Sequence, residues 1–157
     1  MTQRTCRTWI SAAVSAVLIF TAGAASAADY RLTILHTNDV HSHLVPFTVS
    51  GVSGDFGGSA RIGGTVNAIR SSRQNVLLLD GGDQFQGSPF YSFYKGDIEA
   101  YVMNHLKYDA MVVGNHEFDD GPAGLEKFIK QVQFPVLGAN IDCTNEPKLN
   151  GRILPYT

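Results

Sequence analysis

Residues 76–83 read Val-Leu-Leu-Leu-Asp-Gly-Gly-Asp, a short apolar run that leads into a glycine pair and a carboxylate. A continuous apolar run of this length is typical of a β-strand that is covered on both faces, as in a parallel sheet. The glycine pair lets the backbone turn sharply and approach a ligand closely. We therefore expect Asp83 to project from a tight loop at the end of a buried strand.

Three further apolar runs have the same character and occupy residues 32–35, 110–113 and 136–137. Helical spacing of apolar residues separates them, at 62, 66 and 69, at 98, 102 and 106, and at 125, 128, 129 and 132. Strand and helix thus alternate, which predicts an α/β fold built from βαβ units around a mainly parallel sheet. The glycine-rich stretch 50–58 is expected to be a mobile or substrate-side loop.

Polar side chains follow the first three predicted strands. Asp39 and His41 come after the first, Asp83 after the second and Asn115 after the third. The carboxyl ends of parallel strands share one edge of a sheet, where ligands bind. On an extended loop Asp39 and His41 would point to the same side. Each residue alone also fits a turn or a helix cap, but together their oxygen and nitrogen donors predict a divalent metal site.

Three ordered stretches resemble the calcineurin-like metallophosphoesterases. They read Ile-Leu-His-Thr-Asn-Asp-Val-His at 34–41, Gly-Gly-Asp-Gln-Phe-Gln-Gly at 81–87 and Gly-Asn-His-Glu-Phe-Asp at 114–119. More narrowly, they look like the secreted 5′-nucleotidase and 2′,3′-cyclic-nucleotide phosphodiesterase branch. The resemblance implies that the chain forms the first half of an α/β/β/α sandwich, incomplete here, and that it takes part in hydrolysing phosphate esters of nucleotides.

The resemblance also implies a metal centre with two divalent ions, which the donor types allow to be Mn, Co, Zn or Fe. Asp39, His41 and Asp83 would hold one ion. Asp83 and Asn115 would hold the second, with Asp83 as the bridge between the two.

The same resemblance implies a catalytic pair, His116 and Asp119. A metal-activated water would attack phosphorus in line. His116 would stabilise the phosphoryl charge or protonate the leaving oxygen, and Asp119 would hold its imidazole oriented and cationic.

Other motif interpretations do not fit the sequence. Asp120 stands where a zincin would have the second histidine of H-E-x-x-H, and neither a P-loop nor a G-x-S-x-G motif occurs. We expect His105 to be a surface or packing residue and His36 to be structural rather than a ligand. His43 stays open, because it is near the proposed ligands in sequence but not at a ligand position of the family. For the aromatic residues at 85, 90, 91, 93 and 94, packing beneath a loop is favoured over lining a pocket.

The first 27 residues predict a cleaved signal peptide. Arg4 and Arg7 precede an apolar run at 10–20, and Ala25-Ser26-Ala27 forms an A-x-A cleavage pattern. The run is short for an uncleaved membrane anchor, which needs roughly 20 residues. Removing two arginines and no acidic residue takes the net charge from −2 to −4. We expect an exported protein, periplasmic or extracellular, with no stable membrane anchor and with Cys143 as its single cysteine.

The match to the family suggests that residues 28–157 form a truncated amino-terminal part of the catalytic domain. No Gly-His pair occurs in the sequence, so the later histidine motifs of the family are absent and the chain alone is expected to be inactive. Two alternatives remain, a non-catalytic remnant or metal-binding module, and a related exported metallohydrolase acting on a non-nucleotide ester. The resemblance implies a small nucleotide or another phosphoester as the partner. A nucleic-acid polymer is not expected, because the basic excess of nucleic-acid-binding proteins is missing.

Overall fold

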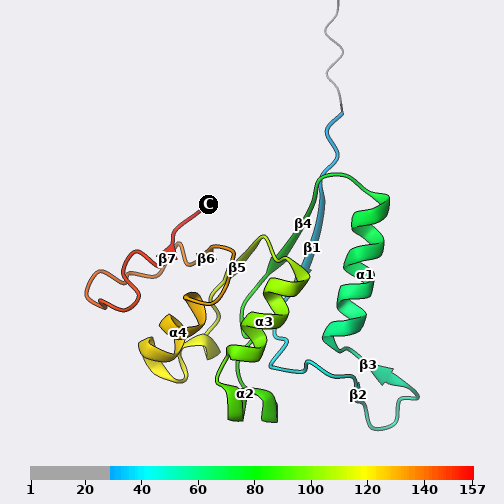
Figure 1. Cartoon of the computed structure of the whole chain (residues 1–157), viewed down its shortest axis with the longest axis horizontal. Helices are drawn as coiled ribbons and strands as arrows, with labels where there is room; N and C mark the ends of the chain where they lie inside the picture. The colour runs from blue at the N-terminus through cyan, green and yellow to red at the C-terminus, as the bar shows by residue number, and fades with distance from the viewer. Residues whose placement is uncertain (1–28) are drawn as a thin grey trace, which may run out of the picture.

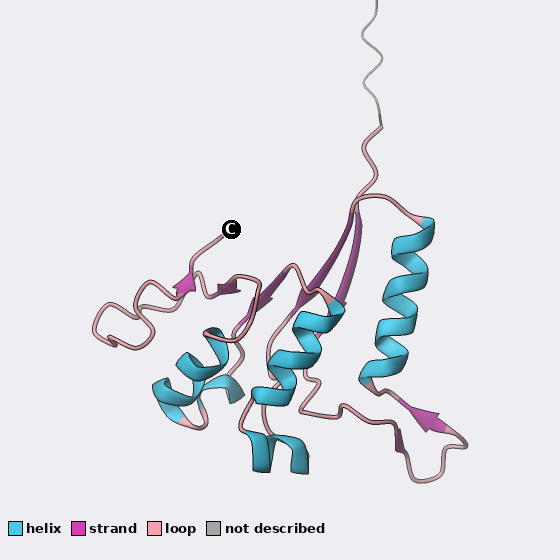
Figure 2. Ribbon diagram, in the orientation of Figure 1, coloured by secondary structure: helices cyan, strands magenta, loops and turns pink. Residues whose placement is uncertain are grey.

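The computed structural model describes residues 29–157. The predicted signal peptide at 1–27 lies outside the described residues. Figures 1 and 2 show strands and helices alternating along the chain, with helices beside a central sheet. Within the described residues, none of the helices combines the length and the apolar character needed to cross a membrane.

The central sheet has the strand order β1-β4-β5-β6-β7, and every neighbouring pair is parallel. This confirms the predicted parallel sheet. Four of its strands match the apolar runs in the sequence, whereas the last is a two-residue strand too short to stand out there. The strands are β1 (Thr33–Thr37), β4 (Val76–Asp80), β5 (Ala110–Val112), β6 (Val136–Leu137) and β7 (Ile153–Leu154).

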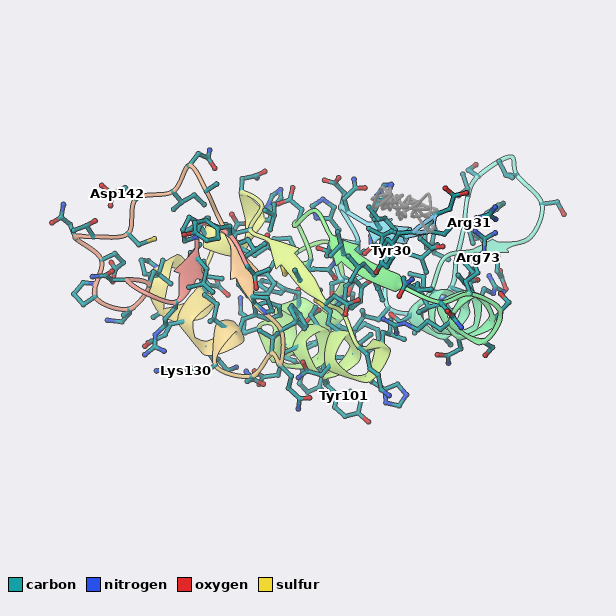
Figure 3. The ribbon with its side chains drawn as sticks, turned by 90° about the horizontal axis from the view of Figure 1, so that it is seen from above. Tyr30, Arg31, Arg73, Tyr101, Lys130 and Asp142 are labelled. Atoms are coloured by element: carbon teal, nitrogen blue, oxygen red, sulfur yellow. The ribbon has the colours of Figure 1, made fainter. Side chains whose placement is uncertain are left out.

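Three helices lie along one face of this sheet (Figure 3), in the segments where the apolar spacing predicts helices. They are α1 (Ser59–Ser72), α3 (Asp97–Leu106) and α4 (Gly121–Ile129), the last ending before residue 132. The buried face of α3 differs from the apolar pattern, because Glu99, Ala100 and Met103 are the buried residues of this helix. The buried apolar side chains of the helices pack against strand residues such as Leu78 and Met111, and together they form the core.

The opposite face of the sheet carries apolar side chains that no described element covers. Ile34 is 55% exposed, Val112 42% and Leu154 37%. Alternation along a strand sends these residues away from the helices, while their neighbours Leu35, Met111 and Ile153 join the core. The described residues therefore bury one side of the sheet only.

Three short pieces of structure were not predicted. The segment after Asp83 contains α2 (Pro89–Tyr94), which begins with Pro89 and with Ser88 accepting the backbone N–H of Phe90 (3.2 Å). Both are favourable at a helix start. The antiparallel hairpin of β2 (Phe47–Thr48) and β3 (Asp55–Phe56) includes part of the glycine-rich stretch expected to be a loop. Finally, η1 (His116–Phe118) is a single 3₁₀ turn after β5.

Candidate metal centre

Three side chains from three strand ends meet at the carboxyl edge of the sheet. His41 follows β1, Asp83 follows β4 and His116 follows β5. One potential ligand atom from each lies within 4.8 Å of the other two. The imidazole rings of His41 and His116 are 5.0 Å apart, centroid to centroid, and nearly perpendicular. The structure thus brings together residues that are up to 75 positions apart in sequence, as parallel strands at one edge require.

The loop after β1 is not extended, which corrects our expectation for Asp39 and His41. Both have left-handed backbones, with φ of 51° and 47°. Backbone N–H groups of Asp39 and His41 donate to the carbonyls of Gly82 and Asp83 (both 3.0 Å), and these bonds stabilise a conformation that costs a non-glycine residue energy. The two side chains still share a side, since Asp39 Oδ1 is 3.8 Å from His41 Nε2.

His41 presents one ring nitrogen to the centre. Its Nδ1 lies 3.1 Å from the carbonyl oxygen of Phe85. A carbonyl only accepts, so Nδ1 carries a proton, and Nε2 is the ring nitrogen that lies near Asp39. Metal-binding histidines are usually held in this way by a hydrogen bond from the second nitrogen.

Asp83 lies at the middle of the cluster. Its backbone is left-handed (φ 56°) and its Oδ1 accepts the backbone N–H of His116 (3.0 Å). Gly114 passes so close that an added Cβ would clash with Asp83 Oδ1. Asn115 directly precedes η1 and is exposed to solvent. The loops after β4 and β5 are therefore in direct contact around the Asp83 carboxylate.

His116 and Asp119 form a hydrogen-bonded pair, with Nδ1 2.7 Å from Oδ2. This bond raises the pKa of His116 above its usual value, and the same bond lowers the pKa of Asp119. The pair is therefore biased towards imidazolium and carboxylate. Because Nδ1 is engaged by Asp119, Nε2 is the nitrogen left to contact another group.

Two buried carboxylates beside the centre were not singled out from the sequence. Glu117 is fully buried and accepts backbone N–H groups from the loops around Asp83 and Gly114. Asp80, at the end of β4, accepts hydrogen bonds from Gly82, Thr37 and Gln84. Glutamate and aspartate are rarely buried without partners. Their position next to glycine turns was the sequence signal, but only the fold shows that they are buried.

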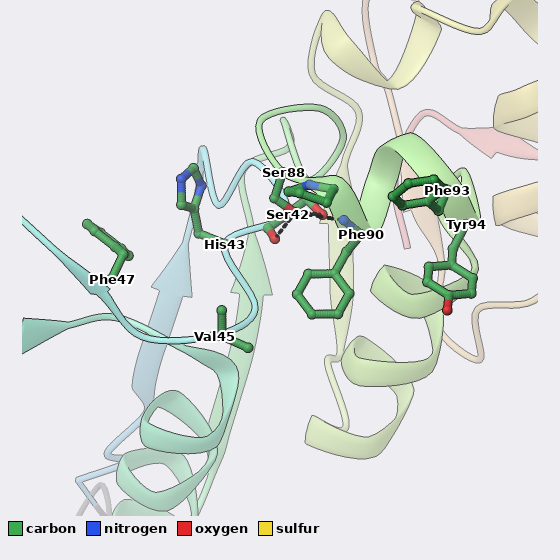
Figure 4. A pocket seen from close by; sticks show the side chains of 9 residues that line it. Ser42, His43, Val45, Phe47, Ser88, Phe90, Phe93 and Tyr94 are labelled. Carbon is green, nitrogen blue, oxygen red and sulfur yellow. Dashed lines mark hydrogen bonds between the residues drawn. The ribbon is translucent and has the colours of Figure 1, made fainter.

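An apolar cavity of about 340 Å³ opens beside the loop that follows His41 (Figure 4). Among its lining residues are Ser42, His43, Phe90, Phe93 and Tyr94. Part of the aromatic segment therefore lines a cavity, against our expectation that it packs beneath a loop. The other two aromatic rings of the segment, at 85 and 91, are buried in the core, so for them the expected packing is confirmed.

The remaining histidines and the cysteine lie apart from the three-residue cluster. His105 is exposed and stacks on Tyr101, with the rings 6.3 Å apart. His36 is exposed on the uncovered face of the sheet. His43 packs edge-on against Phe47, with the rings 5.2 Å apart, and its Nδ1 lies 3.2 Å from the carbonyl of Val40. Cys143 is a free thiol at the edge of the core.

The donors in this cluster fit a divalent metal ion. Carboxylate and imidazole together suit borderline ions such as zinc, manganese, cobalt and iron. In His41, Nδ1 is held by the carbonyl of Phe85 and leaves Nε2 as the possible ligand atom, and Asp83 is held by contacts to its backbone and to one oxygen. Asp39 lies next to His41 and extends the donor set.

Comparison with known proteins matches residues 32–155 to the family described as calcineurin-like phosphoesterase. The chain is 46% identical to human 5′-nucleotidase over 152 residues, which cover 92% of this chain and 26% of the human protein. It is 46% identical to the snake venom 5′-nucleotidase of Naja atra over 139 residues, covering 82% of this chain and 26% of that one. The crystal structure of a 5′-nucleotidase precursor from Thermus thermophilus is similar with a TM-score of 0.75 and 44% identity, over 80% of this chain and 25% of that chain. The chain thus spans about a quarter of the length of these relatives.

Proposed function

The chain belongs to the calcineurin-like phosphoesterase family, and from this premise we propose that its protein hydrolyses phosphate esters of nucleotides. The observation that carries the proposal is the convergence of His41, Asp83 and His116 within 4.8 Å at the carboxyl edge of the sheet. The similarity to 5′-nucleotidases supports a nucleotide as the substrate class.

Asp39, His41, Asp83 and Asn115 are the proposed metal ligands. Asp83 has the central place, because it lies between the loops that carry the others. Bound there, two divalent ions would activate a water and stabilise the charge on the phosphoryl oxygens.

His116 and Asp119 are the proposed catalytic pair. Asp119 holds Nδ1 of His116, so that Nε2 is directed away from it and is free to donate to a phosphoryl or leaving-group oxygen. The raised pKa of His116 favours the protonated imidazole that such donation requires.

We also propose that residues 1–27 act as a signal peptide and that residues 28–157 are the amino-terminal part of a longer catalytic domain. The quarter-length match to the relatives supports the second point, and a venom relative supports export. Four ligand residues are few for two ions, so we propose that further ligands lie outside this chain.

The test compares the intact protein with Asp83→Asn. Hydrolysis of a nucleoside 5′-monophosphate should require a divalent ion, disappear with EDTA and return with Mn²⁺. The Asp83→Asn change should lower kcat/KM by more than about 100-fold, because even outer residues of metal sites typically contribute 10–100-fold.

The matched control is Asp142→Asn, which changes an exposed aspartate that bonds to Thr144. It should leave hydrolysis unchanged. If Asp83→Asn is as active as the wild type, the proposed centre is wrong. If a simple phosphodiester is cleaved but a nucleotide is not, the protein is a phosphoesterase and the proposed substrate class is wrong.

A further inference from the structure

Glu117 makes an unusual set of contacts for a residue outside the ligand set. It is 0% exposed, and its carboxylate accepts four backbone N–H groups. Oε2 accepts from Asp83 (2.9 Å) and Gly114 (2.6 Å), whereas Oε1 accepts from Gln84 (2.8 Å) and Phe85 (3.3 Å). Hydrogen bonds to an ionised group are roughly twice as strong as neutral ones.

These four donors belong to two loops, one after β4 and one after β5. The oxygen Oε2 alone joins them, because it accepts from Asp83 in the first loop and from Gly114 in the second. Both segments have left the sheet at this point, so the strands no longer align them. Glu117 therefore replaces the sheet as the structural connection between these loops.

The loop around Asp83 needs such a connection. Asp83 has a φ of 56°, a left-handed conformation that costs a non-glycine residue roughly 1–2 kcal/mol. Its Oδ1 accepts the N–H of His116, the residue directly before Glu117. The same short turn thus holds the backbone of Asp83 through Glu117 and its carboxylate through His116.

We propose that Glu117 is a positioning residue of the metal centre, which fixes the Asp83 carboxylate against the His116 turn. The proposal rests on the proposed function, since it assumes that Asp83 is a metal ligand. Glu117 itself points its two oxygens at backbone amides and takes no place among the ligands. It acts on metal affinity through Asp83.

Glu117→Gln is the most direct test, because glutamine keeps the size of the side chain. Its amide has one acceptor oxygen, so its NH₂ group must face two of the four N–H donors. We expect at least two of these amides to lose protection from hydrogen exchange in the metal-free protein. Mn²⁺ affinity, measured by calorimetry on the intact protein, should fall on the order of 10–100-fold.

Two more variants separate geometry from charge. Glu117→Asp keeps the charge but is shorter by one methylene, and it should also weaken Mn²⁺ binding. Glu126→Gln removes the same charge on α4, where the carboxylate pairs with Lys130 (2.8 Å) and Arg152 (3.5 Å). It should leave Mn²⁺ affinity and the exchange of the four amides unchanged.

The outcomes distinguish this proposal from the proposed function. If the wild type binds no Mn²⁺, the proposed function fails, while exchange of the four amides without metal still tests the role of Glu117. Wild-type Mn²⁺ affinity in both Glu117 variants would overturn the positioning role. If neither variant folds, rapid exchange of these amides in the wild type would overturn it.

Discussion

Asp80 lies under the loop that carries Asp83, and its burial raises its pKa to about 6 from 3.8, with the nearby charge of Glu117 adding to the effect. The folded protein therefore keeps a proton on Asp80 that the unfolded chain loses above pH 4. Stability must then fall as pH rises through the interval from 3.8 to about 6, and stay level beyond it.

We predict that Asp80→Asn removes this pH dependence. The amide resembles the protonated acid, and Thr37 and Gln84 can exchange donor and acceptor roles to bond with it. Relative to the wild type, the variant should gain on the order of 3 kcal/mol in free energy of unfolding between pH 4 and pH 7. Urea unfolding at several pH values measures this difference. If the free energies of unfolding of the variant and the wild type differ by the same amount at every pH, the prediction is wrong.

The His116–Asp119 pair gives a second prediction for a single residue. Asp119→Asn removes the hydrogen bond to a carboxylate that is the main cause of the raised pKa of His116. The pKa of His116 should fall towards its usual value in the metal-free protein, which NMR titration can follow. Turnover of the intact protein should fall on the order of 100-fold, the lower range for acid–base catalysis.

The control variant is again Asp142→Asn, which changes an exposed aspartate bonded to Thr144. It should leave the pKa of His116 unchanged. An unchanged pKa of His116 in Asp119→Asn would mean that Asp119 does not set its protonation.

At the scale of elements, two adjacent glycines of α1 have different surroundings. A Cβ on Gly63 would lie 2.7 Å from Cδ2 of Leu106 in α3, whereas a Cβ on Gly64 would meet no atom within 4 Å. Gly63 therefore lets α1 and α3 approach each other closely. Gly64 has no such contact with α3.

We predict gains of different size for the two alanine substitutions. Gly64→Ala should raise the free energy of unfolding by about 0.5–1 kcal/mol, the difference in helix propensity. Gly63→Ala has the same gain in helix propensity, but the end of the partly buried Leu106 side chain must shift to make room, so the net gain should be smaller. Urea unfolding of both variants measures the difference. Equal gains at both positions would show that the Leu106 side chain moves at no cost.

At the scale of the whole molecule, the sheet is covered on one face only in the described residues. Ile34, Val112 and Leu154 are apolar and more than a third exposed on the other face. Uncovered apolar surface of this kind usually marks a contact with another part of the protein or a partner.

We predict that the chain of residues 29–157, produced alone, binds a hydrophobic dye through this face. Replacing Ile34 and Val112 together by threonine should reduce dye fluorescence. Tyr101→Thr is the control, because Tyr101 is 69% exposed but lies on α3. A chain that melts sharply and cooperatively without binding dye would contradict the prediction.

The sequence alone predicted the parallel sheet, the three longer helices and the residues expected to form the centre. These features depend on local patterns, since apolar runs mark buried strands and polar residues after them mark the ligand edge. It also identified the family from three motifs, and the match over residues 32–155 confirms that identification. The individual roles of Asp39, His41, Asp83, Asn115, His116 and Asp119 stay predictions.

The tertiary structure decided which polar residues are buried and what they hold. Glu117, Glu99 and Asp80 look like ordinary charged residues in the sequence, yet each is enclosed by segments that are distant along the chain. The left-handed backbones of Asp39 and His41 depend on carbonyls of the neighbouring loop, and so cannot be predicted from a pattern that assumes an extended strand. Local sequence determines which element forms, but hydrogen bonds between loops depend on which strand ends the fold places side by side.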